Sequence, residues 1–297
     1  MLFVSSLMLL AAFSPALALA STTMAPEMTS LSTSTGSYNW GGYAVTGTTG
    51  SVTSVSGSWT VPTTTASANL GLNPTFGLAS PSLASAFSST FASRPDPISR
   101  PSAVYYAAFW VGIDGFNSQT VEQTGILAES TSTATTYFAW YEFYPYESVI
   151  EITTASTSTG TSTPATVKSG DAISASVTYS AGTFTLTISD TTEGWTYSKT
   201  GSQSGAQESS AEWIVETPEV NGRLASLADF GTVTFSGCDA TIAPSTTSEP
   251  IGTFSSSSSC YAITIYNYPR ANTVMASPSS IGTSSTSFSV TWKSAGP

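Results

Sequence analysis

Histidine does not occur anywhere among the 297 residues of this chain. Imidazole is the base that activates serine and cysteine nucleophiles, and it is also the most common metal ligand in proteins. Its absence excludes Ser–His and Cys–His catalysis and excludes imidazole metal centres. Glycine-rich phosphate-binding motifs are missing as well. If the chain is an enzyme, carboxyl and carboxamide groups must carry its chemistry.

Charged side chains are scarce, at 8% of the residues, whereas an ordinary soluble domain has roughly 25%. With 7 Lys plus Arg against 18 Asp plus Glu, the net charge is −11. So few basic groups cannot neutralise phosphates, which argues against nucleic-acid binding. A folded protein loses stability in acid when its paired carboxylates take up protons. A chain with few ion pairs has little stability to lose in this way, which favours an acidic environment. A Ser/Thr-rich surface or cell-envelope protein is the alternative explanation of this composition.

Long apolar runs are limited to the N-terminus. Residues 1–20 combine an apolar stretch with a small-residue Ala-Leu-Ala end, which predicts a signal peptide cleaved after Ala20. An uncleaved anchor is the alternative, and Pro15 and the short run disfavour it. Residues 21–38 are low in complexity and are interpreted as a short propeptide or linker. We expect a secreted mature protein without stable membrane insertion.

Cysteine is almost absent too, with Cys238 and Cys260 as the only two. In an exported protein an isolated pair of cysteines is typically oxidised. We therefore expect one disulfide between them, which leaves no thiol nucleophile.

Short stretches rich in β-branched and aromatic residues recur from Asn39 onward, bounded by Gly, Ser and Pro. They lie at 52–61, 104–111, 135–144, 172–179, 183–189, 211–216, 232–235, 261–266 and 288–292. Several alternate strictly between apolar and polar residues, which is the period of a half-buried strand. This pattern predicts an all-β sandwich or barrel, with 39–297 as one domain. The stretch 63–103 is expected to be a long surface insertion or lid.

Carboxyl and amide groups gather beside aromatic residues in three segments. They are FWVGIDG at 109–115 with QTG at 123–125, FAWYEFYP at 138–145 and AEWIVE at 211–216. Glu212 and Glu216 share a strand face about 13 Å apart, which is too far for the roughly 5–9.5 Å of a glycosidase pair. Partners on neighbouring strands, whose Cβ atoms approach to about 5 Å, are better candidates.

Each candidate residue also has a purely structural explanation. A strand glutamine is usually just hydrogen-bonded, and glutamates on a sheet face are usually solvated. Tryptophans and tyrosines pack in cores more often than they line a cleft.

Seven motifs in order resemble those of the glutamic peptidase family, the eqolisins. The motifs are NWGG at 39–42, SGSWTVP at 56–62, WVGIDG at 110–115, QTG at 123–125, AWYEFYP at 139–145, AEWIVE at 211–216 and DFGTVTF at 229–235. The resemblance covers most of the mature chain.

This resemblance implies an antiparallel β-sandwich of two seven-stranded sheets, a concanavalin-like jelly roll. It places the catalytic glutamine on Gln123 and the catalytic glutamate on Glu216. It also implies cleft or supporting roles for six residues: Trp40, Trp110, Asp114, Trp140, Glu142 and Tyr144. The implied activity is hydrolysis of protein or peptide substrates at acid pH by a pepstatin-insensitive monomer that needs no metal or cofactor.

The chain departs from the family pattern at some positions. Glu122 occupies a usually apolar position, and strand alternation should turn its side chain away from Gln123. The stretch 63–103 looks longer than the family's connection. A non-catalytic module, lectin-like or from a cell envelope, is the alternative function for the same sandwich.

Overall fold

The computed structural model describes residues 33–66, 103–220, 223–267, 273–283 and 285–296. The expected signal peptide and most of the expected insertion, residues 67–102, lie outside the described residues. The regular secondary structure of the described residues is β-strand, apart from one four-residue helix, α1 (Ile251–Phe254). This confirms the all-β prediction. No helix in the described part of the chain has the length and hydrophobicity needed to cross a membrane.

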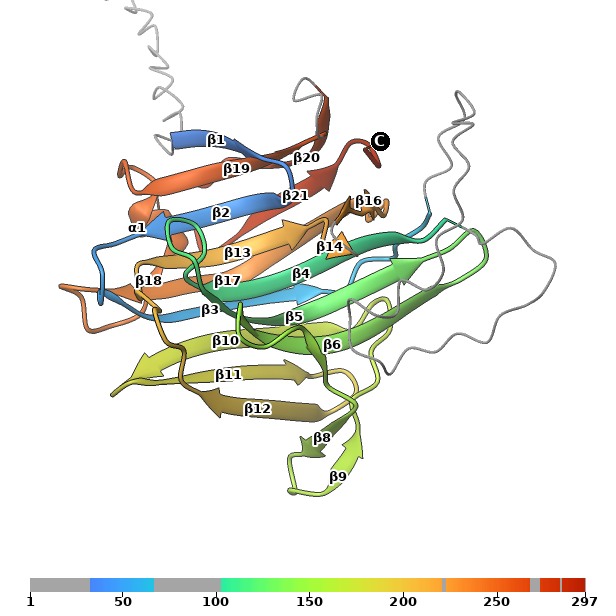
Figure 1. Ribbon diagram of the computed structural model, residues 1–297, viewed down its shortest axis with the longest axis horizontal. Helices are drawn as coiled ribbons and strands as arrows, with labels where there is room; N and C mark the ends of the chain where they lie inside the picture. Colours follow the sequence, from blue (N-terminus) through green and yellow to red (C-terminus); the bar gives the residue numbers. More distant parts are fainter. Residues whose placement is uncertain (1–32, 67–102, 221–222, 268–272, 284, 297) are drawn as a thin grey trace, which may run out of the picture.

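Six antiparallel strands form the layer that carries the candidate site, and we call them the site layer. In spatial order they are β19 (Cys260–Tyr266), β2 (Trp40–Thr46), β13 (Ser210–Glu216), β4 (Tyr105–Ile113), β5 (Val121–Ser130) and β6 (Thr135–Tyr144). One further strand, β1 (Thr33–Ser37), pairs in parallel with β19. Part of the low-complexity segment 21–38 therefore contributes a strand to this layer (Figure 1).

Six more antiparallel strands form the back layer. In spatial order they are β21 (Phe288–Trp292), β17 (Thr232–Ile242), β3 (Val52–Thr60), β10 (Ala172–Ser180), β11 (Thr183–Asp190) and β12 (Trp195–Gly201). The strict alternation of β11 is typical of this layer, since Phe184, Leu186 and Ile188 are buried and the threonines between them are not. The two layers stack as a sandwich (Figure 1).

The two layers are hydrogen-bonded to each other at one edge, because β20 (Val274–Pro278) pairs with both β19 and β21. The pairing therefore forms one continuous network of 19 strands, and the expected division into two seven-stranded sheets is not confirmed. The short strands are β7 (Ile150–Glu151), β8 (Thr154–Thr157), β9 (Ser162–Pro164), β16 (Ser226–Leu227), β18 (Glu249–Pro250) and the hairpin of β14 (Glu219–Val220) with β15 (Arg223–Leu224).

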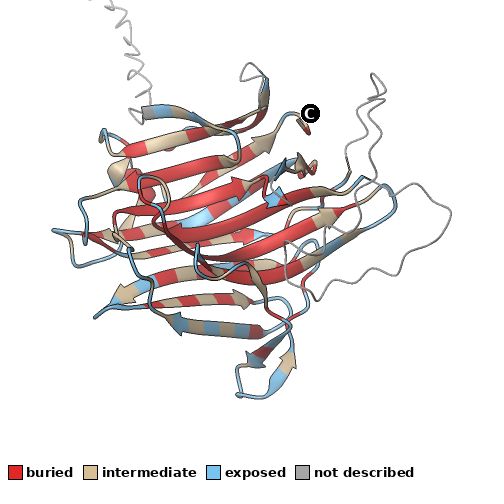
Figure 2. Ribbon diagram, viewed as in Figure 1, coloured by how far each residue is buried: buried red, intermediate tan, exposed pale blue. Residues whose placement is uncertain are grey.

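The site layer is buried on both faces, whereas the back-layer strands β11 and β12 alternate along their length (Figure 2). Residues such as Phe109, Ile126 and Trp213 point between the layers and form the main core. The Trp213 indole also donates a 2.7 Å hydrogen bond to the Ser56 carbonyl of β3, which ties the layers together. On the opposite face, a second cluster that includes Trp110 underlies the candidate site.

The expected disulfide is wrong, because Cys238 and Cys260 are both free and buried. Cys238 lies on β17 in the back layer, and Cys260 begins β19 in the site layer. The two strands do not pair with each other. Both cysteines instead fill the main core as small apolar side chains.

Candidate active site

Gln123 and Glu216 lie on the same face of the site layer, separated by strand β4. Gln123 on β5 is opposite Gly112, and Glu216 at the end of β13 is opposite Ala108. The two positions are therefore offset by four residues along β4, with Trp110 between them. Ala108 is small, and the Glu216 side chain extends over β4 to Trp110, whereas the Gln123 amide turns toward Glu142 on β6. Both line one cavity of about 360 Å³.

Trp110 can occupy this position because Gly125 is opposite it on β5. A Cβ atom at Gly125 would overlap the Phe109 carbonyl oxygen and would come within 2.6 Å of the Trp110 Cβ. The QTG motif therefore supplies two features at once. Its glutamine reaches the cavity, and its glycine leaves room for the indole underneath.

Both oxygens of the Glu216 carboxyl accept hydrogen bonds from neutral donors. Trp110 Nε1 donates to Oε2 over 2.8 Å, and Asn39 Nδ2 donates to Oε1 over 3.2 Å. Burial raises the pKa of Glu216 to about 7, although hydrogen bonds from Trp110, Asn39 and Trp40 act in the opposite direction. These N–H groups favour the ionised carboxylate, and burial favours the acid.

The Gln123 carboxamide is held by Glu142, which faces it on β6. Gln123 Nε2 donates to Glu142 Oε2 over 2.7 Å, and the buried Gln123 Oε1 has no hydrogen-bond partner among the described residues. Burial, followed by the charge of Glu216, raises the pKa of Glu142 to about 8, although the hydrogen bond from Gln123 acts in the opposite direction. One N–H and the carbonyl oxygen of the carboxamide therefore have no hydrogen-bond partner among the described residues.

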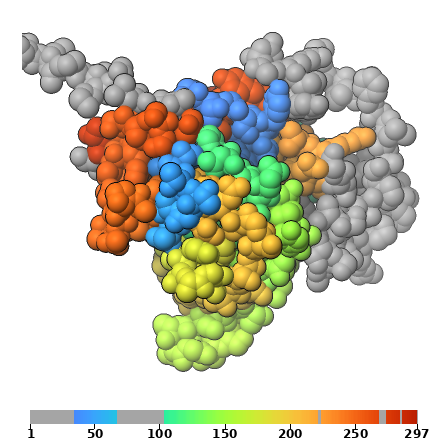
Figure 3. Space-filling model, turned by 60° about the vertical axis from the view of Figure 1, so that its left-hand side comes forward, coloured from blue at the N-terminus to red at the C-terminus, as the bar shows by residue number. Residues whose placement is uncertain are grey.

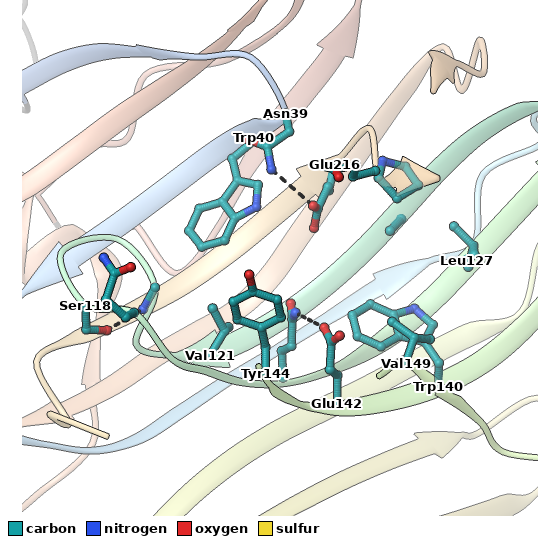
Figure 4. A pocket seen from close by; sticks show the side chains of 16 residues that line it. Asn39, Trp40, Ser118, Val121, Leu127, Trp140, Glu142, Tyr144, Val149 and Glu216 are labelled. Carbon is teal, nitrogen blue, oxygen red and sulfur yellow. Dashed lines mark hydrogen bonds between the residues drawn. The ribbon is translucent and has the colours of Figure 1, made fainter. Parts of the chain in front are cut away.

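Aromatic side chains form the walls of the cavity (Figure 4). Trp40 packs edge-on against Trp110, with ring centroids 4.9 Å apart. Tyr144 is 50% exposed at the rim, whereas Trp140 is buried. Such a surface offers large apolar contact area around a few polar groups, which is typical of a binding cleft.

Four of the six predicted cleft residues line the cavity: Trp40, Trp140, Glu142 and Tyr144. Trp110 lies beneath it, fully buried, and reaches it only through its bond to Glu216. Asp114 is elsewhere. Its carboxylate is fully buried and accepts hydrogen bonds from the backbone N–H groups of 207–209, at 2.7–2.9 Å. It holds the chain segment that enters β13 and does not line the cavity.

Four polar lining residues received no role from the sequence: Asn39, Ser118, Gln119 and Glu219. Asn39 opens the NWGG motif and could have been singled out there. Its partner Glu216 is 177 positions away, however, and nothing local to either residue indicates the contact.

Glu122 is fully buried and does not line the cavity. Its carboxyl oxygens and those of the fully buried Glu212 have no hydrogen-bond partner among the described residues. Burial, followed by the charge of Asp114, raises the pKa of Glu122 to about 9, and burial also raises that of Glu212. The Glu122 carboxyl is therefore protonated at neutral pH.

No group of three or more Cys, Asp or Glu side chains within the described ranges is arranged to hold a metal ion. The candidate site consists of one carboxyl group and one carboxamide, each held by a hydrogen bond with a residue of a neighbouring strand.

Comparison with known proteins identifies the family. The model of the Peptidase A4 family matches residues 38–292. Aspergillopepsin-2 of Aspergillus niger is 36% identical over 149 residues, which cover 50% of each protein, so the chain spans about half the length of this curated relative.

Solved structures agree on the fold. Scytalido-glutamic peptidase with a transition state analog inhibitor superimposes with a TM-score of 0.59 at 23% identity, over 86% of this chain and 98% of that one. Aspergilloglutamic peptidase from Aspergillus niger gives a TM-score of 0.50 at 28% identity, over 64% and 99%. Because the family model spans nearly all of the strands described above, the chain belongs to the Peptidase A4 family, the glutamic peptidases whose motifs its sequence resembles.

Proposed function

We propose that this peptidase is a secreted endopeptidase in which Glu216 and Gln123 form the catalytic pair. One observation carries the proposal. A carboxyl group and a carboxamide from separate strands line the same cavity, and each is oriented by a hydrogen bond with a residue of a neighbouring strand. This supplies a base and an oxyanion donor at one place without a histidine or a metal.

Glu216 and Glu142, two of the three carboxyl groups that line the cavity, ionise at different pH. The pKa is raised to about 7 for Glu216 and to about 8 for Glu142. As pH rises, Glu216 ionises first, and its charge then opposes ionisation of Glu142. Groups whose environments separate their pKa values take different catalytic roles. Glu216 is therefore the base, and Glu142 keeps its proton and holds Gln123.

The reaction follows from these roles. The Glu216 carboxylate removes a proton from a water whose oxygen attacks the carbonyl carbon of the peptide bond. The free N–H of Gln123 donates to the oxyanion that forms, and the Gln123 carbonyl accepts a hydrogen bond from the water. Glu216 then transfers the proton to the peptide nitrogen, the C–N bond breaks, and a carboxylic acid and an amine leave.

Peptides suit the cavity. Relatives of the same fold include SCP-B, solved in a complex with the tripeptide Ala-Ile-His, and scytalido-glutamic peptidase with a peptide-based transition state analog. We propose protein or peptide substrates for this chain, packed against Trp40, Trp140 and Tyr144, and a monomeric enzyme that pepstatin does not inhibit. Family membership sets aside the non-catalytic alternative.

We also propose that the enzyme works at acid pH. Two arguments about the pH of maximal activity lead to different predictions. The scarcity of ion pairs and the family resemblance point to acid pH. The pKa of Glu216, about 7 in the ligand-free site, predicts that activity declines tenfold per pH unit well below 7. A kcat/KM profile between pH 2 and 8 decides between them, because the first predicts a maximum in acid and the second a maximum near neutrality.

The catalytic pair is tested by Glu216→Gln and Gln123→Leu. Each variant is expected to lose about 10³-fold or more of the cleavage of a denatured protein, since base and oxyanion donors contribute about 10²–10⁴-fold each. The matched control is Glu219→Gln, an exposed glutamate that lines the same cavity. Full activity of a folded Glu216→Gln protein would refute the assignment.

A further inference from the structure

Ser37 lies at the start of a hydrogen-bonded chain that ends on the candidate base. Its Oγ donates to Asn39 Oδ1 over 3.0 Å and accepts from the backbone N–H groups of Asn39, at 3.3 Å, and Trp40, at 3.1 Å. One hydroxyl therefore fixes both the side chain and the backbone of the residue pair that enters β2.

Asn39, which Ser37 holds in this orientation, contacts both Glu216 and the residue that follows it. Its Nδ2 donates to Glu216 Oε1 over 3.2 Å, and its backbone carbonyl accepts from the N–H of Thr217 over 2.9 Å (Figure 4). Because the Ser37 hydroxyl donates to Oδ1, the amide turns its N–H₂ end toward the carboxylate. A flipped amide would instead direct an oxygen at Glu216, which is repulsive.

Ser37 is itself placed by β1. The strand pairs with β19 from Thr33 opposite Tyr261 to Ser37 opposite Ile265. The sequence of β1, TSTGS, has no large apolar side chain, so the backbone ladder holds it in place. The ring of Tyr266 packs against Gly36, where a Cβ atom would lie 3.0 Å from the ring.

The same strand lies at the surface beside the cavity. Thr35, Gly36 and Ser37 line a second hollow of about 410 Å³ that shares Asn39, Trp40 and Gly115 with the first. In Figure 3 the blue atoms of this N-terminal segment lie next to the green atoms of the segment that follows β4.

We propose that Ser37 is a positioning residue for the reaction: through Asn39 it orients the Glu216 carboxylate, so that the seating of β1 on β19 maintains the base. The inference rests on the proposed function of Glu216. It assigns a role to a segment whose sequence is otherwise featureless.

The Asn39 N–H donor is important because no positively charged side chain among the described residues lines the cavity to stabilise the Glu216 carboxylate. The titratable groups that line its cavity are Glu142, Tyr144 and Glu219, and the described lining residues include no lysine or arginine. Neutral N–H groups therefore supply the stabilisation of the carboxylate. Loss of the Asn39 donor removes one of them and raises the pKa of Glu216 further.

The first test compares Ser37→Ala with wild type. We expect the acid limb of the kcat/KM profile to move to higher pH by about one unit, since a hydrogen bond to a charged group contributes about 1.5–3 kcal/mol and part of it remains. Ser37→Thr keeps the hydroxyl and should restore the limb. Ser34→Ala, at an exposed position on the same strand, is the matched control and should leave the limb unchanged.

The second test does not depend on activity. The Trp110 indole N–H donates to Glu216, so its ¹H–¹⁵N NMR signal, assigned with Trp110→Phe, should follow the ionisation of Glu216. The titration midpoint should rise in Ser37→Ala and in Asn39→Ala, and the double variant should not exceed Asn39→Ala alone, because the two act in series.

The outcomes separate the two proposals. Midpoints and pH profiles of Ser37→Ala and Asn39→Ala that superimpose on wild type would overturn the positioning role while leaving Glu216 as the base. An equal loss of activity at every pH, with an unmoved midpoint, would mean that Ser37 is merely structural. Undiminished activity of Glu216→Gln would instead refute the catalytic assignment itself.

Discussion

At the scale of single residues, identical side chains take different roles because their surroundings differ. Glu216 has two N–H donors and reaches the cavity, whereas Glu212, four residues earlier on the same strand, is sealed and has no described partner. Glu142 faces the cavity and accepts a hydrogen bond from Gln123. Burial raises the pKa of all three carboxyls, and at Glu216 the hydrogen bonds from Trp110, Asn39 and Trp40 act against it.

Glu142 gives a prediction at this scale. Glu142→Gln can still accept from Gln123 Nε2 through its amide oxygen, whereas Glu142→Leu leaves the carboxamide without an acceptor. We expect kcat to decrease in the order wild type, Glu142→Gln, Glu142→Leu, with about a 10–100-fold loss for leucine, because a buried donor left without an acceptor costs about 1–3 kcal/mol. Steady-state kinetics with thermal melts as a control measure this. Equal kcat values for the two variants would contradict the role of the Gln123–Glu142 contact.

At the scale of elements, the site depends on how β4 and β5 approach each other. The expected strand list covered β3, β4, β6, β10, β11, β13, β19 and β21 closely and the first part of β17, because β-branched and aromatic residues are concentrated in these strands. It did not include β5, β2, β12 or β1. Strands β5 and β2 are buried on both faces and carry glycine or polar residues, so they lack the two-residue period.

Gly125 gives a prediction at this scale. Gly125→Ala places a methyl group against the Phe109 carbonyl and Trp110, so β4 and β5 must separate or the indole must move. We expect a loss of about 1–3 kcal/mol in the free energy of unfolding, together with a greater than tenfold loss of activity as Trp110 leaves Glu216. Urea unfolding and kinetics measure the two effects.

Gly282→Ala is the matched control for that experiment. Gly282 is exposed, and nothing lies within 4 Å of its Cβ position. Its unfolding free energy should stay within about 0.5 kcal/mol of wild type. A Gly125→Ala protein as active and as stable as this control would contradict the close-approach argument.

At the scale of the whole molecule, buried carboxyl groups set how stability depends on pH. Glu122 has a folded pKa of about 9, and its surroundings include the acidic Asp114 and Glu208. Because the folded state holds this proton more tightly than the unfolded state, stability is greatest in acid and falls as pH rises from about 4.5 to 9. Each such group contributes a slope of about 1.4 kcal/mol per pH unit within that window. Glu142 and Glu216 act in the same direction up to about 8 and 7.

Glu122→Gln should therefore flatten this dependence. Between pH 5 and 8 we expect the slope of unfolding free energy against pH to decrease by about 1.4 kcal/mol per unit, since one buried acid no longer ionises. Urea unfolding at several pH values measures it, and Glu219→Gln serves as the exposed control. A slope identical to that of wild type would show that Glu122 does not titrate in this range.

The sequence by itself determined the chemistry and the class of fold. Without histidine only carboxyl and amide groups remained, and local alternation was sufficient for an all-β chain because it depends only on neighbours along one strand. Tertiary structure decided which groups meet. Asn39 contacts Glu216 from 177 positions away, β20 joins the two layers, and the two cysteines remain apart as buried free thiols. Such contacts depend on strand order and register, which arise from the packing of the whole sandwich and not from any local pattern.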